Sequence, residues 1–201
     1  MSRLRGFVAE HRALLRIGGV DARDWLQGLV SNDVRHLAPG RPVYAAMLTP
    51  QGKYLFDFFL VEAGDGAVLI DVAADRAAAL AQRLSMYRLR RAVTVEAETS
   101  ASVALVWGDG PAPAVDRALV VRDPRTPALG WRVYADDGEA VPADVAPATR
   151  ADYDALRVAL GVPETGVELI PDDTFILEAG FERLHGVDFR KGCYVGQEVT
   201  A

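Results

Sequence analysis

The chain has 201 residues, half of them hydrophobic and a quarter charged, a composition typical of a soluble globular protein with one large or two small domains. Its net charge of −6 argues against nucleic acid and anionic membranes as partners, and no apolar run approaches the ~20 residues that span a bilayer. A single cysteine excludes an internal disulfide and favours a reducing compartment such as the cytoplasm.

The first half of the chain predicts helical and strand segments in alternation. A helix begins near Asp21, where a carboxylate can cap it, and ends before Pro39. A second helix carries Leu80, Leu84 and Leu89 on its apolar side. The strands are predicted over residues 43–49, 54–62, 67–73 and 92–98, and the second helix over residues 73–89.

The second half repeats this pattern, with loops rich in proline, alanine and glycine between the elements. Its strands are predicted over residues 102–108, 117–124 and 130–137, and its helix starts near Thr149 and ends before Pro163. The chain therefore predicts an α+β protein of two modules, residues 1–99 and residues 100–201. Each module has an antiparallel sheet with helices packed on it.

The only cysteine lies in the sequence KGCYVGQE, at residues 191–198. A free cysteine is usually a small buried hydrophobic residue. Here Lys191 stands two residues before Cys193, and a nearby ammonium group lowers the pKa of a thiol and raises its thiolate fraction. Cys193 is therefore a candidate nucleophile or metal ligand, with Lys191 supporting its thiolate. The packing interpretation stays open on composition alone.

Asp57 and Lys53 are the second pair of candidates. Asp57 stands between two phenylalanines of a predicted strand, and a solvated strand carboxylate is the commoner interpretation. The alternative, which we expect for a carboxylate with apolar neighbours, is that Asp57 faces a cavity between the two modules and holds a cationic or hydrogen-bond-donating ligand. Lys53 and Lys191 are the only lysines among 22 basic residues, which hints at a specific role for each.

The three histidines, His11, His36 and His185, are scattered and lack metal-ligand spacing, so surface or packing roles are favoured over zinc binding. The chain has no metalloprotease, serine-hydrolase or phosphate-loop motif. A serine or zinc hydrolase is therefore poorly supported.

The KGCYVGQE segment resembles the signature of the YgfZ-type proteins, in the superfamily of the glycine-cleavage T-protein (aminomethyltransferase). The segments DARDWLQGLVSNDV, YAAMLTPQGKYLFDFFL, YRLRRAVTV and LRVALGVPETGVELIP resemble further family blocks, in the family's order, so the resemblance covers nearly the whole chain. It implies ferredoxin-like α+β modules around a central folate channel. It also implies a C-terminal β-barrel, which we expect to be absent or truncated because the chain stops just after the signature.

The resemblance implies a tetrahydrofolate-binding factor for the assembly or repair of iron–sulfur (4Fe–4S) clusters, with Cys193 as a redox thiol or transient cluster ligand. Its implied partners are scaffold or carrier proteins and client enzymes, in the bacterial cytoplasm or, in a eukaryote, the mitochondrial matrix. The candidate cofactor-binding residues are Asp57, Lys53, Tyr194, Gln197 and Glu198, the last three by shaping the cysteine loop.

Two departures from the T-protein pattern weigh against aminomethyl transfer. Ala159 occupies the place of a pterin-binding glutamate, and only Asp57 remains of a pair of aspartates. The letters LEAG recur at residues 177–180, but at the wrong place in the chain. A folate-dependent one-carbon transferase is nevertheless the alternative function. A third possibility is a non-catalytic adaptor with a vestigial folate site.

Overall fold

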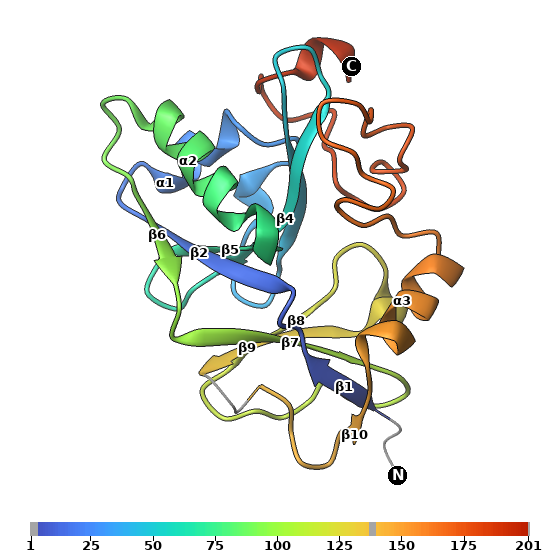
Figure 1. Cartoon of the computed structure of the whole chain (residues 1–201). Helices are drawn as coiled ribbons and strands as arrows, with labels where there is room; N and C mark the ends of the chain where they lie inside the picture. Colours follow the sequence, from blue (N-terminus) through green and yellow to red (C-terminus); the bar gives the residue numbers. More distant parts are fainter. Residues whose placement is uncertain (1–3, 137–139, 201) are drawn as a thin grey trace.

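Two five-stranded sheets build the molecule, whose computed structural model describes residues 4–136 and 140–200 (Figure 1). The first sheet, ordered β3-β4-β5-β2-β6, is antiparallel throughout. The second, ordered β10-β1-β7-β9-β8, is antiparallel except for the β1–β10 pair. The first sheet contains β2 (Arg12–Gly18), β3 (Val43–Leu48), β4 (Tyr54–Glu62), β5 (Val68–Ala73) and β6 (Thr94–Glu98). The second contains β1 (Arg5–Val8), β7 (Ala101–Trp107), β8 (Leu119–Arg122), β9 (Trp131–Asp136) and β10 (Ala146–Pro147).

Helices cover the sheets from two sides. Helices α1 and α2 pack on the outer face of the first sheet, whereas α3 packs into the core that the two sheets share (Figure 1). The described residues form α1 (Ala22–Gln27), α2 (Ala77–Arg88) and α3 (Arg150–Ala159), with short 3₁₀ turns at Val34–His36, Ala74–Arg76, Pro127–Leu129 and Gln197–Val199. None of these helices is long and apolar enough to cross a membrane.

Side-chain alternation along β4 separates two cores. Phe56, Phe58 and Leu60 pack with α1 and α2, whereas Phe59 packs in the core between the sheets. Successive side chains of a strand point to opposite faces, so Asp57 shares the inner face with Phe59. The pattern that predicted the strand therefore also directs its carboxylate towards the second sheet.

The α+β class and the predicted strands are confirmed. The strands predicted over residues 43–49, 54–62 and 67–73 are β3, β4 and β5, with ends shifted by at most one residue. The helix predicted to start near Thr149 and end before Pro163 is α3, and Thr149 caps it through a capping box with Asp152.

The helix predicted from Asp21 towards Pro39 is too long, because α1 ends at Gln27. The Asp21 carboxylate does not cap the helix and instead accepts a hydrogen bond from the Ala92 amide at 2.8 Å. Beyond the helix, the Ser31 hydroxyl accepts a hydrogen bond from the Ala46 amide. Polar side chains that bond to distant backbone compete with helix continuation, and here they end it early.

The prediction for Leu89 is also wrong. Helix α2 ends at Arg88, and Leu89 has a φ of 48° and is 86% exposed. Leu80 and Leu84 are fully buried as predicted. The chain turns sharply at Leu89 to lead into β6, so this side chain leaves the apolar face of the helix.

The division into residues 1–99 and 100–201 does not describe the sheets. Strand β1 pairs with β7 in the second sheet, although it belongs to the predicted first module. The C-terminal segment runs back along β4, where Tyr54 exchanges backbone hydrogen bonds with Asp172 and Thr174, each at 2.9 Å (Figure 1). The two halves of the chain are therefore interleaved.

Candidate functional site

The loop around Cys193 presents its thiol to solvent. Lys191, by contrast, is only 4% exposed. Its Nζ donates hydrogen bonds to the carbonyl of Gln27, at 2.7 Å, and to that of Val30. It also lies 4.8 Å from the centre of the Tyr194 ring. Burial lowers the pKa of the Lys191 ammonium to about 8, although the nearby carboxylates of Asp33 and Asp188 act in the opposite direction.

This geometry does not support the predicted role of Lys191. Its ammonium points into the protein and satisfies carbonyls at the end of α1, and within the described residues it makes no contact with Cys193. Carbonyls at the end of a helix lack intrahelical donors and need partners of this kind. Lys191 is therefore an anchor of the loop.

Three further contacts fix the loop. Tyr194 is buried, and its backbone amide donates to Gln197 Oε1 at 3.3 Å. The Val195 amide donates to the Gly28 carbonyl at 3.3 Å. The Thr200 hydroxyl donates to the Gly196 carbonyl at 3.1 Å. Tyr194 and Gln197 thus shape the loop, as the resemblance implied, whereas Glu198 is exposed and makes no polar contact within the described residues.

Asp57 lies between the two sheets, where it was predicted to lie, and is 4% exposed. Its Oδ1 accepts hydrogen bonds from the Tyr54 and Thr165 hydroxyls, at 2.8 and 2.6 Å, and its Oδ2 accepts one from the Tyr44 hydroxyl at 3.0 Å. It borders a cavity of about 30 Å³. That volume is on the scale of one water molecule.

Buried charges surround this cavity. Asp71 is fully buried and pairs with Arg12 at 2.6 Å and with Arg132 at 2.6 Å. Burial alone raises the pKa of Asp71, but the two guanidinium groups outweigh it and hold this pKa below its usual value. Arg132 also lies 3.4 Å from Asp123, and its guanidinium carbon lies 3.8 Å from the centre of the Phe59 ring. This network occupies part of the space between the sheets, beside the hydrophobic core.

Lys53 does not join either group. Its Nζ donates to the Asp173 carbonyl at 2.7 Å and lies 3.7 Å from the centre of the Phe175 ring. It therefore fastens the C-terminal segment to the β3–β4 turn. The predicted site residues fall into three places: the cysteine loop, the cavity beside Asp57, and this turn.

The buried arginine–aspartate network was missed by sequence analysis. Asp71 is the only charged residue in VLIDVA, and Arg132 lies between apolar residues in WRVYAD; these interruptions are the signal that was available. Opposite charges within two apolar strands indicate a pair, but which charges meet depends on how the sheets face each other.

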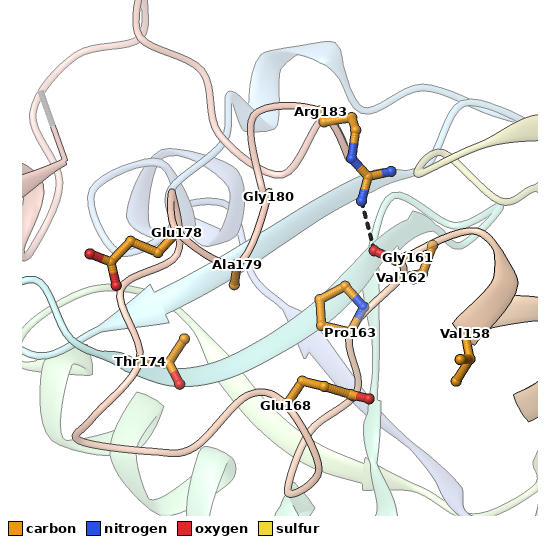
Figure 2. A pocket seen from close by; sticks show the side chains of 10 residues that line it. All are labelled: Val158, Gly161, Val162, Pro163, Glu168, Thr174, Glu178, Ala179, Gly180 and Arg183. Atoms are coloured by element: carbon orange, nitrogen blue, oxygen red, sulfur yellow. Dashed lines mark hydrogen bonds between the residues drawn. The ribbon is translucent and has the colours of Figure 1, made fainter.

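A larger hollow lies beside α3, outside the predicted site (Figure 2). Its volume is about 610 Å³, and Val158, Val162 and Pro163 contribute apolar surface. Arg183 crosses its edge and donates to the Gly161 carbonyl at 2.7 Å, as the dashed line in Figure 2 shows. Glu178 stands at the rim, and its carboxylate makes no hydrogen bond or ion pair within the described residues.

Comparisons with known proteins show which family and which characterised proteins this chain resembles. A family model described as the GCVT N-terminal domain matches residues 7–117. The iron–sulfur cluster assembly factor IBA57, mitochondrial, of Mus musculus is 36% identical over 97% of this chain and 61% of its own length. The protein of the same name from Homo sapiens is 34% identical, with the same two shares of 97% and 61%. The homologue from Pyricularia oryzae is 35% identical over 97% of this chain and 53% of its own length. The chain thus spans about half to three fifths of these relatives.

A solved structure shares the fold. The crystal structure of glycine cleavage system aminomethyltransferase T from Bartonella henselae matches with a TM-score of 0.75 and covers 98% of this chain and 62% of that one. The sequences are 18% identical, so this match shows the fold alone.

Proposed function

Since the chain belongs to the GCVT N-terminal domain family, we propose that it acts in the assembly of iron–sulfur clusters, with the Cys193 thiol as the group that contacts the cluster. The observation that carries this proposal is the contrast within the cysteine loop. Lys191 and Tyr194 are buried and fixed, whereas Cys193 between them is exposed. A loop that is anchored on both sides holds its thiol out towards a partner.

The chemistry requires further ligands. A 4Fe–4S cluster is held by four cysteine thiolates, and this chain supplies one. A scaffold or carrier protein, glutathione or a second copy of the chain must supply the others while the cluster is in transit. The partners of the proposed function are therefore iron–sulfur scaffold or carrier proteins and client enzymes. Its compartment is the bacterial cytoplasm or the mitochondrial matrix.

Cys193→Ser tests the role of the thiol. In cells that lack the native protein, we expect wild-type protein to restore the activities of 4Fe–4S enzymes and Cys193→Ser to restore less than about a tenth of them, because a serine hydroxyl does not supply the soft thiolate that such clusters need. The matched control is Arg190→Gln, an exposed change next to the same loop that should rescue fully. Full rescue by Cys193→Ser would show that the thiol is not needed. If the wild-type protein failed to restore the 4Fe–4S enzymes, the proposed assembly function would be wrong.

The small cavity beside Asp57 argues against that place for tetrahydrofolate. Ligand pockets usually offer roughly 300–1,000 Å³, whereas the cavity there has about 30 Å³ and the Asp57 carboxylate already accepts three hydrogen bonds. We therefore place the folate proposal at the 610 Å³ hollow of Figure 2. Its volume, its apolar wall and the Glu178 carboxylate, which has no partner among the described residues and can accept from pterin N–H groups, support that place.

Anaerobic titration calorimetry with tetrahydrofolate separates the two places. We expect Glu178→Gln to weaken binding at least about tenfold, since a hydrogen bond to a charged group contributes ~1.5–3 kcal/mol. Asp57→Asn should leave the affinity unchanged. Weaker binding by Asp57→Asn but not by Glu178→Gln would place the folate site between the sheets. If neither wild type nor any variant bound tetrahydrofolate, the folate proposal would fail and the adaptor interpretation would be favoured.

The alternative function, aminomethyl transfer, is supported less well. Ala159 at the end of α3 offers no carboxylate, and Asp57 is enclosed by hydroxyl donors. An assay for methylene-tetrahydrofolate from an aminomethyl donor should show no turnover. Clear turnover would reverse this ranking.

A further inference from the structure

Asp33, His36 and Asp188 come together although the histidines show no metal-ligand spacing in the sequence. One ligand atom from each residue lies within 4.8 Å of the other two. His36 Nδ1 lies 3.9 Å from Asp188 Oδ2, which is too far for a hydrogen bond. Ligand atoms that each lie about 2.1 Å from one ion are roughly 3–4 Å apart. The distance between His36 and Asp188 falls within that range, and a carboxylate oxygen of Asp33 lies within 4.8 Å of both ligand atoms.

The backbone holds these groups in place. Asp33 caps the 3₁₀ turn Val34–His36, so Asp33 and His36 belong to one short element. The Asp188 amide donates to the Ser31 carbonyl at 3.1 Å, and the Ser31 hydroxyl donates to the Gly186 carbonyl at 2.6 Å. These bonds join two segments that are more than 150 residues apart in the sequence. The arrangement needs no metal to form.

We propose that Asp33, His36 and Asp188 bind one divalent first-row transition-metal ion of the class of Fe²⁺, Co²⁺ and Zn²⁺. Two carboxylates and one imidazole suit this class, whereas an all-oxygen site would favour Mg²⁺ or Ca²⁺ and a thiolate set would favour Cu⁺. His36 and Asp188 line a hollow of about 630 Å³, which gives an ion and its remaining water ligands access from solvent. The site is separate from Cys193, and it stands whether or not the proposed function holds.

An ion pair balances the charge of the Asp33 carboxylate when no metal ion is bound. Arg35 forms a bidentate ion pair with the Asp33 carboxylate, with a shortest distance of 2.6 Å. This pair holds the pKa of Asp33 well below its usual value. The Arg35 side chain is 68% exposed, so it can turn into solvent when another cation takes its place. The buried Lys191 ammonium, which senses both Asp33 and Asp188, opposes a second positive charge and weakens metal binding.

Titration with Co²⁺ tests the site, followed by calorimetry and by the visible absorption of the bound ion. We expect one Co²⁺ per wild-type chain. Both His36→Gln and Asp188→Asn should lose at least about tenfold in Co²⁺ affinity, since mutating even a residue that only hydrogen-bonds to a metal ligand lowers metal affinity about 10–100-fold. Arg35→Gln should bind Co²⁺ more tightly than wild type, because it removes the competing cation.

The matched control is His185→Asn, which removes a histidine from the same hollow but outside the cluster. Asparagine tolerates the positive φ of 55° at that position, so the fold should persist. This variant and Cys193→Ser should bind Co²⁺ like wild type. Absence of binding, equal binding by His36→Gln, or loss of binding only in Cys193→Ser would each overturn the proposal.

Thermal unfolding provides a second readout. His36 is half-exposed, so His36→Gln should stay folded. Co²⁺ should raise the Tm of the wild-type protein but not that of His36→Gln.

Discussion

At the residue scale, the two glycines beside Cys193 have different reasons to be glycine. Gly196 has a φ of 84°, and a Cβ there would lie 2.3 Å from the Thr49 carbonyl oxygen. At Gly192 a Cβ would meet nothing within 4 Å. Gly196 therefore permits the loop to approach the β3–β4 turn, whereas Gly192 leaves open space beside the thiol.

Alanine at each position makes a matched pair. We expect Gly196→Ala to destabilise the protein by ~1–3 kcal/mol, through backbone strain and the clash with Thr49. Gly192→Ala should change stability little. Urea unfolding of both variants measures the difference, and equal midpoints would contradict the described loop geometry.

At the scale of elements, a short helix and a distant loop complete each other. Helix α1 has only six residues, and Lys191 donates to carbonyls at and just beyond its end, 161 and 164 residues earlier in the chain. A helix this short is not stable alone. Its stability therefore depends on the loop that carries Cys193, and the position of that loop depends on the helix.

Lys191→Met should remove the contact through which helix α1 and the cysteine loop stabilise each other. Loss of the ammonium leaves the Gln27 and Val30 carbonyls without this donor, and we expect a loss of stability of ~1–3 kcal/mol. Hydrogen exchange of the Val195 amide, which donates to Gly28, should accelerate. Lys53→Met is the control, because its lysine donates to one exposed carbonyl and should matter less. Slow exchange at Val195 in Lys191→Met would show that the loop holds without its lysine.

At the scale of the whole molecule, buried charges connect the two sheets. Asp71 lies on β5 of the first sheet, and Arg132 lies on β9 of the second. Tyr134, also on β9, donates to the Asp71 carboxylate at 3.0 Å. A fully paired network of this kind fixes how the sheets face each other, and it leaves the cavity beside Asp57 small.

Asp71→Asn should destabilise the protein by ~3–5 kcal/mol, because it leaves the buried guanidinium group of Arg132 without its main counter-charge. The pKa of Asp71 is lower in the folded state than in the unfolded state. The wild-type carboxylate therefore stabilises the fold at any pH above its unfolded-state pKa, and this stabilisation is lost as the pH falls through its folded-state pKa. The gap in urea midpoint between wild type and Asp71→Asn should therefore narrow in acid. Asp65→Asn, at an exposed ion pair with Arg16, is the control and should be neutral. An equal effect of both substitutions would argue against the buried network.

The sequence by itself determined seven of the strands, β3 to β9, together with the α+β class and the inward direction of Asp57, whereas β1, β2 and β10 were not predicted. Alternation of apolar side chains is a local property, and β4 shows it over its whole length. It also placed Cys193 in a glycine-flanked loop, and the family resemblance followed from that loop and its neighbouring blocks.

Only the tertiary structure decided the early end of α1, the sheet to which β1 belongs and the inward direction of Lys191. It also decided that Asp33, His36 and Asp188 meet. Each of these depends on contacts between segments far apart in the chain, such as Lys191 with Val30 or Ser31 with Gly186. Local patterns specify which face of an element is apolar, but the partner of a buried polar group is set by the packing of whole sheets and loops against one another.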